Sequence, residues 1–271
     1  MIQINDLLKK MEESGYDEIH LSAGTEPFFR KADKITPAMN EKPSRSDLEA
    51  ILKSCVSQTN YNDFMQKNEL SASYSVSGQG RYLIYAFSQR NSIALVLKKA
   101  YHSINECNIE LKGVRNLKIT PGIALLTGKH KKKEAGMCLL MYLLKNKSII
   151  MTAEDRILYP LPHSEGYIFQ CEKEQDYTDI HSFLNFIKKI NPNVLYIENS
   201  LDCNIYNQLM QLAASGIFVI INMPFNDIKR AVDNIRETLI SSNNVSAEQY
   251  IHLYVTEKED GGNVIYSIEN V

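Results

Sequence analysis

The chain has 271 residues, which is enough for one large domain or two modest ones. With 44% hydrophobic and 23% charged residues it has the composition of an ordinary globular protein, and a formal net charge of −2 argues against nucleic acid or an anionic membrane surface as its partner. Its five cysteines are widely spaced without a C-x-x-C pair, which argues against a disulfide framework or a zinc site and predicts a reducing compartment.

The N-terminal part predicts a small α+β domain. Its first residues form an amphipathic, charged segment without the apolar core of a signal peptide. Helices are expected at residues 5–14, 45–56 and 60–66, and short strands at 18–21, 28–31, 71–76, 82–88 and 93–98. Short, partly alternating strands separated by turn residues favour an antiparallel sheet. We assign residues 1–99 to this domain and the polar stretch at 100–111 to a linker.

Strands and helices alternate in the remaining part of the chain, residues 112–271. Strands are expected at 123–126, 148–151, 194–197, 217–221, 250–256 and 263–268, and helices at 132–145, 179–190, 204–215 and 225–240. This alternation is typical of a parallel sheet with crossover helices, so the predicted fold class is α/β. The last two strands are expected to form a hairpin. No apolar run approaches the roughly 18 residues that a membrane span needs, so direct membrane insertion is not expected.

The most informative segment joins the first strand of this second part to its first helix. It has the layout of a phosphate-binding P-loop, G-x-x-x-x-G-K-[ST], in which backbone N–H groups close on phosphate, the lysine reaches the β/γ-phosphates and the hydroxyl holds Mg²⁺. Counting from Gly128, the second glycine is Lys133, the lysine is Glu134 and the hydroxyl is Ala135. A carboxylate at the lysine position repels phosphate. The segment is therefore either a degenerate phosphate site or an unrelated strand–loop–helix unit.

The donors of this segment define the candidate binding residues. If the loop keeps affinity for nucleotide or another anion at the helix N-terminus, we expect six residues to supply it. They are Thr127, Gly128, Lys129, Lys131, Lys132 and Lys133. The competing interpretation is a solvated run of positive charge that binds no ligand.

Three carboxylates near predicted strand ends form a second group. Glu198 ends a strand, where ligand sites of α/β sheets are found, and a plain loop carboxylate is the competing interpretation. Glu154 and Asp155 either hold a water or a cation or cap the backbone. Cys138 and Met141, on the apolar face of the helix after the loop, are expected in the core. No residue is assigned as a catalytic group or as a metal ligand.

Seven phrases follow one another along the chain: GYDEIHLSAGTEPFFR, GQGRYLIYAFSQRNSIALVLKK, ITPGIALLTG, SIIMTAEDRILY, NPNVLYIENSLD, LAASGIFVIINMPF and EDGGNVIYSIENV. In this order they resemble the PilT-like ATPases of twitching motility (type IV pilus retraction), within the type II/IV secretion ATPase family. The resemblance implies a PAS-like α+β domain followed by a RecA-like core with a P-loop NTPase fold. It also implies ATP and Mg²⁺ as ancestral cofactors, and a hexamer in which the N-terminal domain of one subunit packs on the core of the next.

The chain departs from this resemblance at the positions that carry the chemistry. The family's Asp-box glutamate falls on Leu158, its Walker B glutamate on Asn199 and its His-box histidine on Pro224. An arginine implied to meet nucleotide phosphate across domains falls on Leu83, beside Lys98 in the next predicted strand. Phosphoryl transfer relies on positioning and charge compensation, and losing one such donor typically costs about two to three decades in rate. Coordinated loss at several motifs therefore predicts a protein without hydrolysis.

Three functions compete at this point. The leading interpretation is a catalytically inactive PilT-like pseudo-ATPase that acts on a type IV pilus or secretion motor by protein–protein contacts and needs no cofactor. The alternatives are an active or nucleotide-binding pilus motor ATPase with non-standard Walker motifs, in which a one-residue shift makes Glu198 the Walker B acid, and a nucleotide-sensing regulator. The expected partners are a motor ATPase, a platform protein or further copies of the chain. The expected location is cytoplasmic, either free or peripheral at the inner face of the cytoplasmic membrane.

Overall fold

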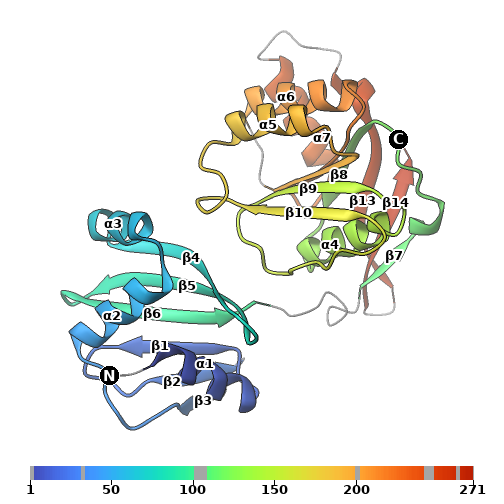
Figure 1. The fold of residues 1–271 in the computed structure, drawn as a ribbon. Coiled ribbons are helices and arrows are strands. Elements are labelled where there is room, and N and C mark those ends of the chain that lie inside the picture. Colours follow the sequence, from blue (N-terminus) through green and yellow to red (C-terminus); the bar gives the residue numbers. More distant parts are fainter. Residues whose placement is uncertain are drawn as a thin grey trace. The chain divides into compact units, whose positions relative to one another are not determined.

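A computed structural model describes residues 3–31, 34–100, 109–198, 202–240, 247–260 and 263–270. The chain divides into two compact units, Met1–His102 and Ser103–Val271, and each is described by itself (Figure 1). Within these described ranges no helix is both long and apolar enough to cross a membrane. Asn199, one of the positions singled out above, lies outside the described residues.

The N-terminal unit is built on one antiparallel sheet of six strands in the order β3-β2-β1-β6-β5-β4. The strands are β1 (Glu18–Ser22), β2 (Phe28–Lys31), β3 (Lys34–Pro37), β4 (Glu69–Val76), β5 (Gly80–Gln89) and β6 (Ser92–Lys99). The pairing confirms the predicted antiparallel arrangement. It also places Leu83 directly opposite Lys98, whose ammonium lies 3.0 Å from the carboxylate of Glu18.

Three helices cover one face of this sheet: α1 (Ile4–Glu13), α2 (Arg45–Cys55) and α3 (Gln58–Lys67). In α1 the buried residues recur at helical spacing, at Ile4, Leu7, Leu8 and Met11, so one side of the helix enters the core. Helix α2 begins with a capping box, in which Ser44 and Asp47 each accept a hydrogen bond from the other's backbone N–H.

The C-terminal unit is built on one sheet of eight strands in the order β10-β9-β11-β12-β8-β13-β14-β7. The strands are β7 (Glu110–Lys112), β8 (Gly122–Thr127), β9 (Ile149–Glu154), β10 (Tyr167–Glu172), β11 (Val194–Glu198), β12 (Phe218–Asn222), β13 (Ile251–Asp260) and β14 (Asn263–Asn270). Strands β10 to β13 of this order run parallel, and β13 and β14 form the predicted antiparallel hairpin. Residues 110 and 111, assigned above to a linker, belong to β7, which pairs with β14.

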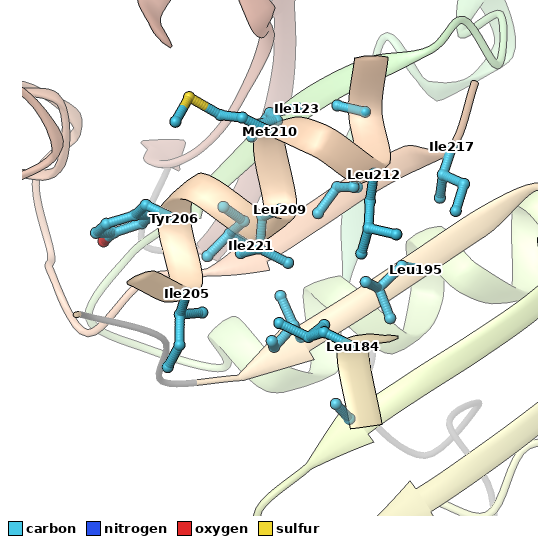
Figure 2. Close-up of a cluster of buried hydrophobic side chains, with 14 of the residues drawn as sticks. Ile123, Leu184, Leu195, Ile205, Tyr206, Leu209, Met210, Leu212, Ile217 and Ile221 are labelled. Atoms are coloured by element: carbon cyan, nitrogen blue, oxygen red, sulfur yellow. The ribbon is translucent and has the colours of Figure 1, made fainter. Parts of the chain in front are cut away.

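Helices cover both faces of this sheet. They are α4 (Lys132–Leu144), α5 (Ile180–Ile190), α6 (Cys203–Ala214) and α7 (Ile228–Ile240). Helices α5, α6 and α7 share one apolar cluster with one face of the sheet, and Figure 2 shows Leu209 and Leu212 of α6 packed over Leu195 and Ile221 there. Helix α4 packs on the opposite face, where it buries Leu139, among others. The three layers confirm the predicted parallel sheet with crossover helices.

The strand order determines where a site can form. Strand β8 lies between β12 and β13, so the chain leaves β8 and crosses over two strands before it returns as β9. The carboxyl ends of β8, β9, β11 and β12 therefore lie along one edge of the sheet, at Thr127, Glu154, Glu198 and Asn222. Open α/β sheets place their ligand sites at such a change of direction.

Candidate functional site

The loop after β8 holds a carboxylate of its own chain. It spans Gly128 to Lys131, and α4 begins at Lys132. The backbone N–H groups of Lys129 and His130 both donate to Oε2 of Glu257, with the His130 bond at 2.8 Å. The Nδ1 atom of His130 lies 2.9 Å from Oε1 of the same carboxylate. Glu257 follows Thr256, which pairs with Thr127, so the neighbouring strand β13 delivers an anion directly to the loop amides.

Electrostatics agree with this geometry. Partial burial on its own raises the pKa of the Glu257 carboxyl, but the hydrogen bonds from His130 and from the Lys129 amide favour the charged form and outweigh it. The pKa of Glu257 is lowered as a result, and the group is an anion at neutral pH.

Gly128 is required by packing at this loop. A β-carbon at this position would lie 2.2 Å from the hydroxyl of Tyr266 and 2.9 Å from Oε2 of Glu257. The Tyr266 hydroxyl donates to the backbone carbonyl of His130 at 2.7 Å, and the Tyr266 side chain is fully buried. The glycine that the sequence assigns to a phosphate loop therefore makes room for a tyrosine and a glutamate of the C-terminal hairpin.

Lys133 is enclosed by carboxylates. Its ammonium lies 3.3 Å from Glu154 and 3.1 Å from Glu198, and it also donates to the backbone carbonyl of Arg156. The exposed fractions of the three side chains are 17% for Lys133, 0% for Glu154 and 6% for Glu198. One ammonium thus compensates two buried carboxylates at the ends of adjacent strands, β9 and β11.

Three of the four oxygen atoms of these carboxylates accept hydrogen bonds, whereas Oε2 of Glu154 is buried with no hydrogen-bond partner among the described residues and has the Lys133 ammonium as its ion-pair partner. Glu154 accepts from the Thr152 hydroxyl at 2.8 Å and from the Gln170 amide at 2.9 Å. Glu198 accepts from the backbone N–H of Asp155 at 3.1 Å and from the Tyr196 hydroxyl at 3.2 Å. The hydrogen bonds to the other three oxygen atoms hold both carboxylates in one orientation.

Burial is the largest influence on the pKa of the Glu198 carboxyl. Loss of solvation raises the pKa of its carboxyl, the nearby Lys133 ammonium opposes that shift, and the Glu154 carboxylate adds to it. The pKa of Glu198 is therefore raised, in contrast to that of Glu257.

The six candidate binding residues of this segment lie in different environments. Lys129 and Lys131 are exposed, as the solvated interpretation expects. Lys132 is half-buried and donates to the carbonyl of Met223, and burial lowers the pKa of its ammonium. Thr127 is buried, and its hydroxyl oxygen has no hydrogen-bond partner among the described residues. The interpretation of the whole loop as solvated charge is therefore wrong for Lys132 and Lys133.

Glu134, placed by counting at the lysine position, points elsewhere. Its carboxylate accepts from the Tyr159 hydroxyl at 2.8 Å, and it is Lys133 that reaches the strand-end carboxylates. Ala135 is fully buried in α4 and offers no hydroxyl. Cys138, expected in the core, is only half-buried, as is its neighbour Met141 one turn later.

Two further positions that depart from the resembled motifs, Leu158 and Pro224, lie in the segments that follow β9 and β12. Leu158 packs half-buried against the α4 cluster. Pro224 is exposed just after β12, and the carbonyl of the next residue, Phe225, accepts from the backbone N–H of Gly128 at 3.2 Å. Within the described ranges no group of three or more histidine, cysteine, aspartate or glutamate side chains is arranged to hold a metal ion.

Sequence reasoning missed Glu257 and Tyr266. Both lie in the closing hairpin, and Glu257 is 128 residues from Lys129. The local pattern predicts the hairpin but not that β13 lies beside β8. The sequence does carry a signal for Glu154 and Glu198, because each ends an apolar strand. The interpretations of Glu154 as a backbone cap and of Glu198 as a plain loop carboxylate are corrected by the burial of both side chains and by their shared ion pair with Lys133.

Comparisons by sequence and by fold both find the pilus retraction protein PilT. No model of a known protein family matches the chain. Over 241 residues, 86% of the chain, it is 22% identical to the type IV pilus ATPase PilU of Pseudomonas aeruginosa and spans 63% of that protein's length. Over 241 residues it is also 21% identical to the type IV pilus retraction ATPase PilT of the same organism, of which it covers 70%.

Two solved structures share the fold. The pilus retraction motor PilT with bound ADP superposes with a TM-score of 0.84 at 20% identity, covering 100% of this chain and 83% of that one. The ATPase DotB of Legionella pneumophila superposes with a TM-score of 0.79 at 12% identity, covering 99% of this chain and 80% of that one. The chain therefore has the fold that these two structures share.

Proposed function

We propose that this chain is a relative of the pilus and secretion motor ATPases that does not hydrolyse ATP and acts through protein contacts. The position of Lys133, 3.3 Å from Glu154 and 3.1 Å from Glu198, carries the proposal. Moving this ammonium to a phosphate leaves two buried carboxylates unpaired, and breaking a buried ion pair costs about 3–5 kcal/mol. The lysine best placed to reach a nucleotide is therefore held by the protein itself.

The loop supports the same proposal, because its donors already have an acceptor. The amides of Lys129 and His130 donate to Glu257, and the space beside Gly128 is filled by Tyr266 and Glu257. A phosphate at these amides would have to displace an ionised carboxylate that is held by three donors. The residues present therefore do not fit a nucleotide phosphate in this arrangement.

A magnesium ion lacks its usual protein oxygen here. The hydroxyl of a working P-loop falls by counting on Ala135, whose methyl group is buried in the first turn of α4. Without a cofactor to bind, the proposed role is to bind other proteins. We assign the N-terminal unit to the PAS-like domain and the C-terminal unit to a RecA-like core with a degenerate P-loop.

The proposed partners follow from the relatives. The sequence matches are a type IV pilus ATPase and a type IV pilus retraction ATPase, so we propose that this chain joins a motor of that kind or its platform protein, in the cytoplasm or at the inner face of the membrane. Nucleic acid and direct membrane insertion form no part of the proposal.

A nucleotide-binding protein is the second candidate, and one observation favours it. Lys133 lies in the first turn of α4, at the positive end of the helix, and its ammonium reaches the carboxyl ends of β9 and β11. A ligand that supplied its own charge compensation to Glu154 and Glu198, such as a metal-bound nucleotide, would release this lysine for phosphate.

Calorimetric titration with Mg-ATP separates the two candidates. The pseudo-ATPase predicts no saturable heat with the unmodified chain. The nucleotide-binding candidate predicts saturable binding that survives Lys129→Ala and disappears in Lys133→Ala, with circular dichroism used to verify that both variants fold. For the protein-contact role, light scattering of mixtures with a pilus retraction ATPase or a platform protein should show a complex whose stability does not change with ATP. Failure to bind either protein contradicts that role.

A further inference from the structure

Large apolar side chains gather on the surface at one edge of the C-terminal unit. Among the described residues eight large hydrophobic side chains are exposed, and five of them belong to β9, β10 and α5. These five are Ile149 (45% exposed), Tyr167 (59%), Phe169 (47%), Phe186 (50%) and Ile190 (46%), and they are called the edge patch below. Exposed apolar patches rimmed by charge mark interaction sites in soluble proteins.

The edge patch is continuous across the sheet. β10 is the terminal strand of the sheet (Figure 1). In it, Tyr167 pairs with Ile149 of β9, and the Tyr167 ring stacks on Phe169 at 6.1 Å between ring centroids. Alternate residues of a strand share a face, so Tyr167 and Phe169 lie on the same face as Cys171, which packs against the α5 cluster.

Helix α5 extends this surface. Its residues His181 and Asn185 contact Gln208 of α6, so that side of α5 faces its neighbour. At 100° per residue, Phe186 and Ile190 lie on the side turned away from α6, towards β10. Asn193, three residues after Ile190, accepts from the Ile149 backbone N–H through its side-chain oxygen and donates its own backbone N–H to the Ile149 carbonyl, so the segment after α5 is tied to the start of β9.

The backbone edge of β10 is partly occupied by local hydrogen bonds. The backbone N–H of Tyr167 donates to the Ser148 carbonyl just before β9, and that of Lys173 donates to the Glu154 carbonyl at the end of β9. Because N–H groups alternate in direction along a strand, those of Ile168, Gln170 and Glu172 point away from β9. Of these, Ile168 donates to His163, and Glu172 donates to Asp176. Because two of the three outward backbone donors already have acceptors, this edge favours a partner that binds the edge patch through side chains over one that extends the sheet.

The two ends of the edge patch carry opposite charge. Exposed lysines gather at the end where β9 and β10 begin, together with the acid Glu165. These lysines are Lys145, Lys147, Lys188 and Lys189. Exposed carboxylates gather where β10 ends and α5 begins, together with the base Lys173. These carboxylates are Glu174, Asp176 and Asp179. A surface with an apolar centre, one basic end and one acidic end is complementary to itself when it is turned through 180°.

We infer that the edge patch binds a second copy of this chain about a two-fold axis, with the aromatic centres in contact and the basic end of each protomer on the acidic end of the other. This surface lies in β9, β10 and α5 and uses none of the residues Gly128–Lys131, so it does not depend on whether nucleotide binds or is hydrolysed. Burial of ten apolar side chains across such a contact supplies the hydrophobic centre that stable interfaces have.

Sedimentation equilibrium of the full chain tests the apolar centre. The unmodified protein should dimerise, and Tyr167→Ser combined with Phe169→Ser should weaken the dimer at least about tenfold, as loss of a central aromatic contact does. Ile35→Ser is the matched control, because Ile35 is 61% exposed in the N-terminal unit and should leave the dimer unchanged. The inference is overturned by a protein that stays monomeric at all concentrations, or by a dimer whose dissociation constant is unchanged by the β10 substitutions. A monomer is the result expected if another protein or another part of this chain covers the edge patch.

Charge reversal tests the two-fold orientation. The homodimer should be weakened by Lys147→Glu with Lys189→Glu, and equally by Glu174→Lys with Asp176→Asn. Each double variant reverses the net charge of one end and so places like charges together at both ends of the contact, and asparagine at position 176 keeps the oxygen that accepts from the Glu172 N–H. A mixture of these two variants should form a heterodimer tighter than either homodimer, since every reversed end then meets an end of opposite sign. A mixture that associates no better than its components overturns the two-fold arrangement, and unchanged circular dichroism shows that the variants are folded.

Discussion

The ammonium of Lys133 lies 3.1 Å from the carboxylate of Glu198, at the carboxyl end of β11. The same ammonium lies 3.3 Å from Glu154 on the adjacent strand, so a single positive charge serves two buried negative ones. In the loop before α4 the negative group comes from elsewhere in the chain: the carboxylate of Glu257 accepts from the backbone N–H groups of Lys129 and His130. In both places, groups that would meet a nucleotide are bound by the chain itself.

Replacing Lys133, in the first turn of α4, should destabilise the fold more than replacing an exposed lysine of the preceding loop. Lys133→Met leaves Glu154 and Glu198 buried without a counter-charge, which costs about 3–5 kcal/mol in the free energy of unfolding. Lys129→Met is the matched control: its side chain is exposed, and the expected change is within about 0.5 kcal/mol. Urea denaturation measures both. Equal stability of the two variants would show that the buried ion cluster does not form.

The free energy of unfolding should depend on pH through Glu198. Because burial raises the folded-state pKa of this acid, the native state binds its proton more tightly than the unfolded chain does. Stability from this group is present below the ordinary glutamate pKa of about 4.3 and is lost as pH rises from there through the raised folded pKa. Glu198→Gln removes this contribution. Denaturation series from acid to neutral pH should therefore fall less steeply for the variant, and superimposable curves would contradict the assignment.

Gly128 should tolerate a methyl group only if Tyr266 gives way. Gly128→Ala places a β-carbon 2.2 Å from the Tyr266 hydroxyl, and overpacking of this kind costs about 1–3 kcal/mol. Tyr266→Phe removes the clashing oxygen, so the double variant should recover part of that loss relative to the sum of the single variants. Thermal unfolding of the four proteins in the cycle gives the coupling. Strict additivity would mean that the two residues are not in contact.

Loss of the Glu257 carboxylate should loosen the loop. Glu257→Ala removes the acceptor of the Lys129 and His130 amides, whose hydrogen exchange should then accelerate while the core strands stay protected. The lowered pKa of Glu257 predicts that acid weakens the same bonds in the unmodified protein, since they are present above its ordinary pKa and are lost as pH falls through the lowered one. Glu269→Ala, an exposed carboxylate paired with Lys258, is the control and should leave the loop amides unchanged.

The elements around the site are predictable from the sequence because their signals are local. The apolar run before Gly128, the loop, and the helical spacing after it fix a strand–loop–helix unit, and the structure places β8 and α4 within a residue of the expected bounds. The strands that were missed, β3, β7 and β10, are short or lie at sheet edges, where one face is exposed and alternation is weak. Their places in the sheets come from pairing and not from local pattern.

The contacts that give the site its character are not predictable in this way. Glu257 reaches the loop because β13 lies beside β8, and strand order is a property of the whole sheet. Counting along the P-loop pattern assigns the lysine position to Glu134, whereas Lys133 is the residue that turns towards Glu154 and Glu198. A shift of one residue along a helix rotates a side chain by 100°, so the count alone does not decide which residue faces the sheet.

Release of inorganic phosphate from Mg-ATP by the purified chain tests the central claim most directly. Because Lys133 is held by two buried carboxylates and the loop amides by Glu257, we predict a rate equal to the protein-free background, with no difference between the unmodified chain and Glu198→Gln. Phosphate release above background that is abolished by Glu198→Gln would contradict the account, because it would show that Glu198 acts in hydrolysis and that its contact with Lys133 opens for nucleotide.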